Sequence, residues 1–175
     1  QAKALLADWE PTLSAACEAR PQRGCWAAWA IFESPLPPLP GVDAGWQSLH
    51  AHHPALRLVS RNHTKPGRNA QPESLSLLAQ LDWSDAHIEE TPEAAAQQLL
   101  DAFIATLPRD TPLPTLVELG AHRWRYAQPA AAGSQSFLYS ERGLWLCGDS
   151  FRGSRVEDAW LSGDELGEAL LGRSV

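Results

Sequence analysis

The residues with the clearest chemical potential lie near the C-terminus, where an apolar run ends in Gly148 and Asp149. A glycine-containing loop with Gly153 follows, and a helical pattern then begins near Arg155 and Val156. A helix N-terminus presents free backbone N–H groups and the positive end of a dipole, and both attract an electron-rich ligand. Asp149 adds a carboxylate that could accept a hydrogen bond from a ribityl or ribose hydroxyl. An alternative stays open, in which Gly153 only makes a turn and Asp149 only caps the helix.

Small residues recur every fourth position of the same helical pattern, at Ala159, Gly163 and Gly167. A stripe of small residues lets a helix backbone approach another surface closely. We therefore expect this stripe to be bare in the chain alone, or to be covered by a second copy of the chain through self-association.

Other catalytic motifs are absent from the sequence. There is no G-x-G-x-x-G dinucleotide loop, no P-loop, no G-x-S-x-G nucleophile elbow and no H-E-x-x-H zinc helix. His50, His52 and His53 lie close together, but their spacing is not that of a zinc-binding helix and no cysteine or acidic residue completes a ligand set. We therefore expect a solvated turn there, no metal site, and no catalytic residue supplied by the chain itself.

The composition excludes several classes of protein. The 175 residues carry 14 Lys and Arg against 21 Asp and Glu, a net charge of −7 that argues against non-specific nucleic-acid binding. No apolar stretch reaches the ~18 residues of a membrane span, and the first residues do not resemble a signal peptide. The 3 cysteines, Cys17, Cys25 and Cys147, form no C-x-x-C pair, which favours reduced core thiols in a cytoplasmic protein. Because the chain contains no Met, we interpret it as a piece of a longer protein.

Periodicity and turn signals predict elements in the order helix, several strands, helix, strands, helix. This order predicts an α+β domain with a mostly antiparallel sheet and flanking helices, rather than a doubly wound parallel sheet. The expected helices cover residues 2–7, 11–20, 94–107 (with Thr91 as cap) and 154–171, and the expected strands cover 25–33, 45–49, 56–60, 75–81, 115–126 (bent at Gly120) and 143–147.

Several motifs together resemble a known family. The C-terminal motif consists of Gly148, Asp149, Gly153, Arg155, Val156, Glu157, Ala159, Trp160, Leu161, Ser162 and Gly163. It resembles the C-terminal FAD motif of the flavin-containing amine oxidase superfamily, and its bacterial renalase-like branch in particular. The segments Arg61-Asn62-x-x-Lys65-Pro66-Gly67-Arg68, Trp83-Ser84 and His122-Arg123-Trp124-x-Tyr126-Ala127-x-Pro129 match the same family in order and spacing. The resemblance covers nearly the whole chain from about Cys25 onward.

The resemblance implies that residues 1–142 are a substrate-binding domain and that residues 143–175 return to an N-terminal FAD-binding domain absent from this sequence. It implies that FAD is contacted by Gly148, Asp149, Gly153, Arg155, Val156 and Ala159. Asp149 would contact the ribityl or pyrophosphate part, and the helix N-terminus would face the pyrimidine edge of the flavin. Asp158 departs from the family pattern, which usually has Gly there. Because the glycine loop is missing, we expect the isolated chain to hold no FAD and to be inactive.

The resemblance also implies a reaction, namely hydride transfer to FAD from a small-molecule amine or from a dihydronicotinamide dinucleotide. Trp124 and Tyr126 are candidate walls of the substrate cavity, although ordinary aromatic residues of a sheet core remain an alternative. Arg61 and Lys65 could attract an anionic substrate, or they could belong to a loop held by local salt bridges. A different class of function also stays open: a non-enzymatic α+β module that binds a small molecule or a peptide.

Overall fold

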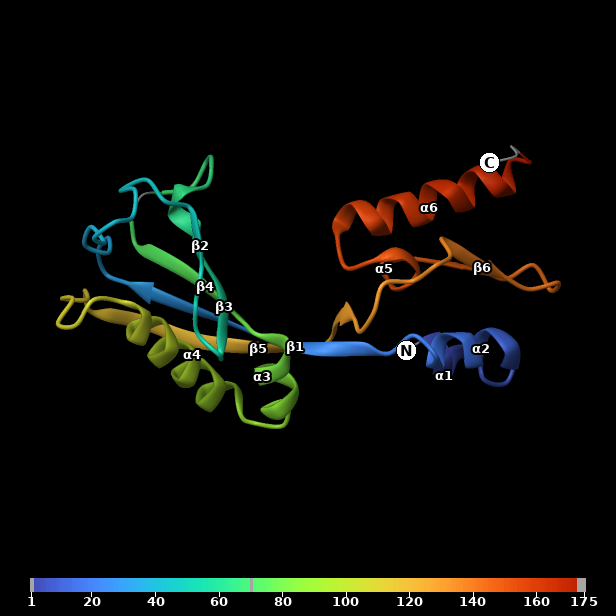
Figure 1. The fold of residues 1–175 in the computed structure, drawn as a ribbon, viewed down its shortest axis with the longest axis horizontal. Helices are drawn as coiled ribbons and strands as arrows, with labels where there is room; N and C mark the ends of the chain where they lie inside the picture. The colour runs from blue at the N-terminus through green and yellow to red at the C-terminus, as the bar shows by residue number, and fades with distance from the viewer. Residues whose placement is uncertain (1, 70, 173–175) are drawn as a thin grey trace. The chain divides into compact units, whose positions relative to one another are not determined.

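The computed structural model describes residues 2–69 and 71–172, and among these it contains one five-stranded sheet and one two-stranded sheet (Figure 1). The order in the larger sheet is β2-β3-β4-β1-β5, with β1 and β3 both antiparallel to β4, and β2 antiparallel to β3. The smaller sheet pairs β6 with β7. The strands are β1 (Gln22–Phe32), β2 (Ser48–His50), β3 (Leu56–Arg61), β4 (Glu73–Ala79), β5 (Leu116–Pro129), β6 (Phe137–Tyr139) and β7 (Trp145–Cys147). The predicted α+β class with a mostly antiparallel sheet and flanking helices is confirmed.

The chain forms two compact units, which are described separately. The sheet unit consists of residues 24–125, and the two-segment unit consists of residues 1–23 and 126–175. The helices are α1 (Ala2–Leu6), α2 (Pro11–Glu18), the single 3-10 turn η1 (Asn62–Thr64), α3 (Leu81–Ala86), α4 (Pro92–Thr106), α5 (Asp149–Arg152) and α6 (Val156–Leu170). The sequence analysis divides the chain by function, into a substrate-binding part (1–142) and an FAD-contact part (143–175), whereas these units are defined by compactness. The functional boundary therefore stays a prediction.

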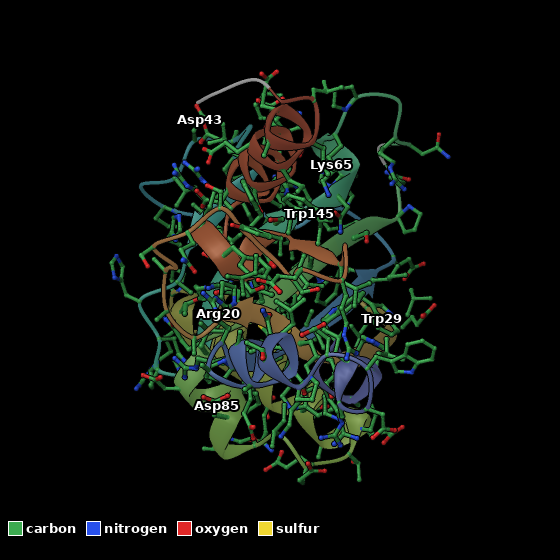
Figure 2. All side chains as sticks on the ribbon, turned by 90° about the vertical axis from the view of Figure 1, so that its right-hand side faces the viewer. Arg20, Trp29, Asp43, Lys65, Asp85 and Trp145 are labelled. Carbon is green, nitrogen blue, oxygen red and sulfur yellow. The ribbon has the colours of Figure 1, made fainter. Side chains whose placement is uncertain are left out.

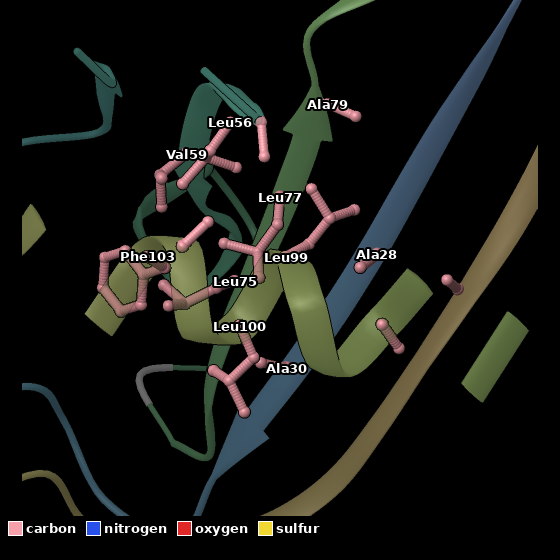
Figure 3. Packing of buried hydrophobic residues seen from close by; sticks show 14 of the residues in the cluster. Ala28, Ala30, Leu56, Val59, Leu75, Leu77, Ala79, Leu99, Leu100 and Phe103 are labelled. Carbon is pink, nitrogen blue, oxygen red and sulfur yellow. The ribbon is translucent and has the colours of Figure 1, made fainter. Parts of the chain in front are cut away.

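The core of the sheet unit forms where α4 packs on one face of the large sheet (Figure 1). Leu75 and Leu77 of β4 point toward Leu99 and Phe103 of α4, and all four side chains are buried (Figure 3). Thr91 caps the helix, since its hydroxyl accepts the N–H of Ala94 at 3.2 Å. The helix and its cap are therefore as the sequence predicts.

The buried residues of β1 follow the two-residue period of a strand. Trp26, Ala28, Ala30 and Phe32 face the core, whereas Trp29 lies on the opposite face and is 36% exposed. Alternate residues of one strand thus build the core and leave an aromatic ring on the other side.

Three local predictions need correction. The strand expected over residues 45–49 begins only at Ser48, because the N–H groups of Gly45 and Trp46 both bond Asp43 in a turn. The loop expected after Gly148 is the short helix α5. The three cysteines are free, but Cys147 is exposed and is therefore not a core thiol, since it lies on an outward-facing position of the small β6-β7 sheet.

Candidate functional site

The Gly148-Asp149 turn of the two-segment unit is held by a buried serine. The N–H of Gly148 donates to Ser162 Oγ at 2.7 Å, and the same hydroxyl donates to the carbonyl of Ser136. Ser162 is 0% exposed, so both bonds are sheltered from water. Gly148 has a φ of 140°, and the site of a Cβ there is open space, so glycine suits the turn. Ser162 therefore fixes the place where β7 gives way to α5.

Asp149 is the first residue of α5, and it is one of the residues that line a hollow of about 330 Å³ within the two-segment unit. One carboxylate oxygen, Oδ1, accepts the N–H of Ser150 at 2.7 Å. Tyr126, which is 59% exposed, lines the same hollow, as do Lys3 and Arg20. The structure thus brings a predicted cofactor residue and a predicted substrate residue to one hollow, together with two cationic side chains that the sequence analysis missed.

The guanidinium of Arg20 spans this part of the unit. It donates to the carbonyl of Ala16 at 2.8 Å and to Gln135 Oε1 at 3.1 Å, and it lies 5.1 Å from the ring centre of Phe151. The side chain of Lys3 pairs with Glu18 at 2.5 Å. Arg20 is therefore the better fixed of the two cations, because its planar group is held at both edges and on one face.

The N-terminus of α6 carries its own carboxylate. Asp158 Oδ2 accepts hydrogen bonds from the backbone N–H of Arg155 at 3.1 Å and from its guanidinium at 3.2 Å. These bonds hold the pKa of the Asp158 carboxyl below its usual range. The same oxygen lies 2.6 Å from the place that a Cβ on Gly153 would take. Asp158 thus places a carboxylate beside the first turn of α6, where Val156 is 88% exposed.

The small-residue stripe of α6 is open. An added Cβ on Gly163 or Gly167 would meet no other heavy atom within 4 Å, and Ala159 is partly exposed. Gly163 and Gly167 are themselves only partly exposed. The described stripe is therefore not packed in the core, while the bare surface and the self-association that the sequence analysis expects stay predictions.

In the sheet unit, Trp124 lies on the face of β5 opposite the helices and is 55% exposed, so it is not a core aromatic residue. The indole of Trp29, labelled in Figure 2, donates from Nε1 to Glu118 Oε1 at 2.9 Å. The ring crosses Gly120 so closely that a Cβ there would lie 2.3 Å from Cζ2. His122 packs edge-on against Trp124 at 4.6 Å. This face therefore presents aromatic rings, of which the sequence analysis identified only Trp124.

Arg61 and Lys65 belong to one loop but differ in their surroundings. Arg61 is 7% exposed and makes two hydrogen bonds to Glu73, at 3.0 Å and 2.6 Å. Its guanidinium also lies 5.0 Å from the ring centre of Trp46. Lys65 is exposed, and its ammonium donates to Asn62 Oδ1 at 2.5 Å. Arg61 is thus paired within the fold, whereas Lys65 can still meet a ligand from solvent.

The comparison with known families gives no assignment, since no protein-family model matches the chain. Within residues 2–69 and 71–172, no group of three or more His, Cys, Asp or Glu residues is arranged to hold a metal ion. No helix in these ranges has the length and apolarity needed to cross a membrane. A functional assignment therefore depends on the residues described above.

The three thiols should differ in reactivity. Burial raises the pKa of Cys25 and of Cys17, whereas Cys147 is exposed on β7 and lines the hollow beside Asp149. Because the thiolate is the reactive form, an aromatic disulfide reagent at neutral pH should label Cys147 first and Cys25 last. The Cys147→Ser variant should lose the fast labelling phase seen by absorbance. A fast phase that survives in this variant would contradict the assignment.

Proposed function

We propose that the chain is the substrate-binding and C-terminal FAD-contact portion of a flavin-dependent oxidoreductase that resembles amine oxidases and renalase. The observation that supports it best is the hollow that brings Asp149 and Tyr126 together. Its volume of about 330 Å³ is at the lower end of the ~300–1,000 Å³ of small-molecule sites. A cytoplasmic location belongs to the same proposal.

The Gly148-Asp149 turn suits FAD better than the N-terminus of α6 does. At the Gly148-Asp149 turn, an open glycine position and a carboxylate stand beside a hollow that also contains two cations. Such a set can accept a hydroxyl hydrogen bond and balance a phosphate charge. At α6, the first-turn N–H groups have no intrahelical partners, but Asp158 already adds a negative charge there. The Gly148-Asp149 turn therefore suits the ribityl and phosphate part of FAD.

In the proposed protein, FAD supplies hydride acceptance from an amine or a dihydronicotinamide. The residues of this chain would bind and orient. Asp149 holds a hydroxyl, and Ser162 keeps Asp149 in place through the N–H of Gly148. Trp124 offers a flat apolar surface for a planar substrate, and Lys65 attracts a negative charge to the same sheet unit. Arg61 has a structural role in this account.

The proposal predicts a difference between this chain and the full-length protein encoded by its gene. The 175-residue chain titrated with FAD should neither quench flavin fluorescence by binding nor produce peroxide from amines or NADH, because it lacks the glycine loop for the phosphates. The full-length protein should purify with bound flavin and show a G-x-G-x-x-G sequence upstream.

Two results would overturn the proposal. One is peroxide production by the 175-residue chain with added FAD. The other is a full-length protein with neither flavin nor an upstream glycine loop, which would favour the non-enzymatic binding module instead.

A further inference from the structure

A second and larger hollow, of about 600 Å³, lies entirely within the sheet unit. It is formed by the loop before β2, the β2-β3 hairpin and the last turn of α4. Its floor includes the core residues Leu39, Val59 and Phe103, which are 8%, 2% and 1% exposed. This hollow falls within the ~300–1,000 Å³ range of small-molecule pockets, and its floor suits the apolar body of a ligand.

Three imidazole rings belong to the rim of the hollow. Among the described residues, the lining includes three histidines, His50, His52 and His53, and no acidic residue. His53 Nδ1 accepts the N–H of Ala55 at 3.1 Å, so the proton of a neutral ring lies on Nε2, which can donate. A rim of imidazoles without carboxylates favours a ligand group that accepts hydrogen bonds or carries a negative charge.

The end of α4 opposes a negative charge, because the last carbonyls of a helix carry the negative end of its dipole. Two of these carbonyls already have donors. Phe103 accepts from the hydroxyl of Thr106 at 2.6 Å, and Ile104 accepts from the N–H of Leu107 at 3.0 Å. These donors reduce the opposition, and imidazole N–H groups at the rim can donate further hydrogen bonds to an acceptor.

We propose that this hollow binds a small apolar monocarboxylate. The hydrocarbon body packs on Leu39, Val59 and Phe103, and the carboxylate lies at the rim with His50 and His52. The site is separate from the flavin proposal and does not depend on it, since all the residues involved belong to this chain and to the sheet unit.

Octanoate titrated into the ¹⁵N-labelled chain tests the site, with octylamine and octanol as comparisons. Octanoate should produce saturable amide shifts concentrated in residues 49–53 and 103–107, with a dissociation constant at least tenfold lower than that of octylamine. Shifts concentrated elsewhere, or equal binding of octylamine, would overturn the proposal.

Two sets of variants test separately how the hydrocarbon body and the carboxylate of the ligand contribute to binding. Ala105 and Ala94 are both exposed on α4, but only Ala105 lines the hollow. Ala105→Trp should narrow the mouth and weaken octanoate binding at least tenfold, whereas Ala94→Trp should leave it unchanged. The double variant His50→Gln, His52→Gln should weaken octanoate at least fivefold and leave octanol unaffected. Octanoate binding at the wild-type level in both Ala105→Trp and the histidine variant would contradict the assignment.

Discussion

Replacement of Glu73 by alanine should lower the free energy of unfolding of the sheet unit by about 3–5 kcal/mol, because it leaves a buried guanidinium without its partner. Glu73 is 0% exposed and accepts two hydrogen bonds from Arg61. It also accepts the N–H of Leu36 at 3.1 Å, so the loop after β1 loses an anchor as well. Urea denaturation followed by circular dichroism measures the change.

A double variant is the matched control. Arg61→Met with Glu73→Leu removes both charges and keeps side chains of similar length, so it should be clearly more stable than Glu73→Ala. His63 Nδ1 lies 2.7 Å from Glu73 Oε1 without the alignment of a good hydrogen bond. Both variants remove this contact, so it does not affect the comparison between them. If Glu73→Ala unfolds at the wild-type urea concentration, the pair contributes little and Arg61 is available for another role.

The sequence analysis left open that Arg61 belongs to a loop held by salt bridges, but it did not identify Glu73 as the partner. Arg61 precedes Lys65 and Arg68 in a basic cluster, and a cluster of that kind suggests a surface that attracts anions. The partner is 12 positions further along the chain. It comes close only because β3 and β4 pair antiparallel, with Arg61 opposite Leu75. Pairing across strands depends on register, which local composition does not specify.

Elements with strong periodicity were predictable, and short ones were not. The helix α4 has an apolar face of four turns, a threonine cap and a proline in its first turn, and the structure agrees with all three. The strand β6 has three residues and the helix α5 has four. Segments of that length are stabilised by neighbours, as α5 is by the serine that holds the preceding turn.

In the candidate site, too, features set by local sequence were predictable, and contacts between distant segments were not. The Gly148-Asp149 turn follows directly after an apolar run, so a local pattern could identify it. The stacking of Trp29 across Gly120 joins two strands far apart in the sequence, and only the folded sheet shows it. A glycine in the middle of an expected strand was the available signal, because it often marks close approach of another group.

If the chain belongs to a longer flavoprotein, as proposed, replacement of Asp149 by alanine in that protein should raise the dissociation constant of FAD by about ten- to a hundredfold. A hydrogen bond to a charged acceptor contributes ~1.5–3 kcal/mol, and 1.4 kcal/mol corresponds to a factor of ten in affinity. Asp149 lines the hollow of the two-segment unit. Its Oδ1 accepts the N–H of Ser150, while Oδ2 makes no hydrogen bond to the described residues. This second oxygen is the acceptor that the proposal assigns to FAD.

The control is Asp164→Ala, since Asp164 is an exposed carboxylate of α6 that does not line the hollow. It removes the same charge from the same unit and should leave FAD affinity unchanged. Asp149 is not the N-cap of α5, since Gly148 holds that position and no side chain caps it. If Asp149 only stabilises the start of α5 through the N–H of Ser150, Asp149→Ala should lower the melting temperature equally with and without FAD. Its FAD affinity should then equal that of the wild type. FAD titration of the apoprotein, with melting curves of each variant, separates a ligand contact from a purely structural role of the same residue.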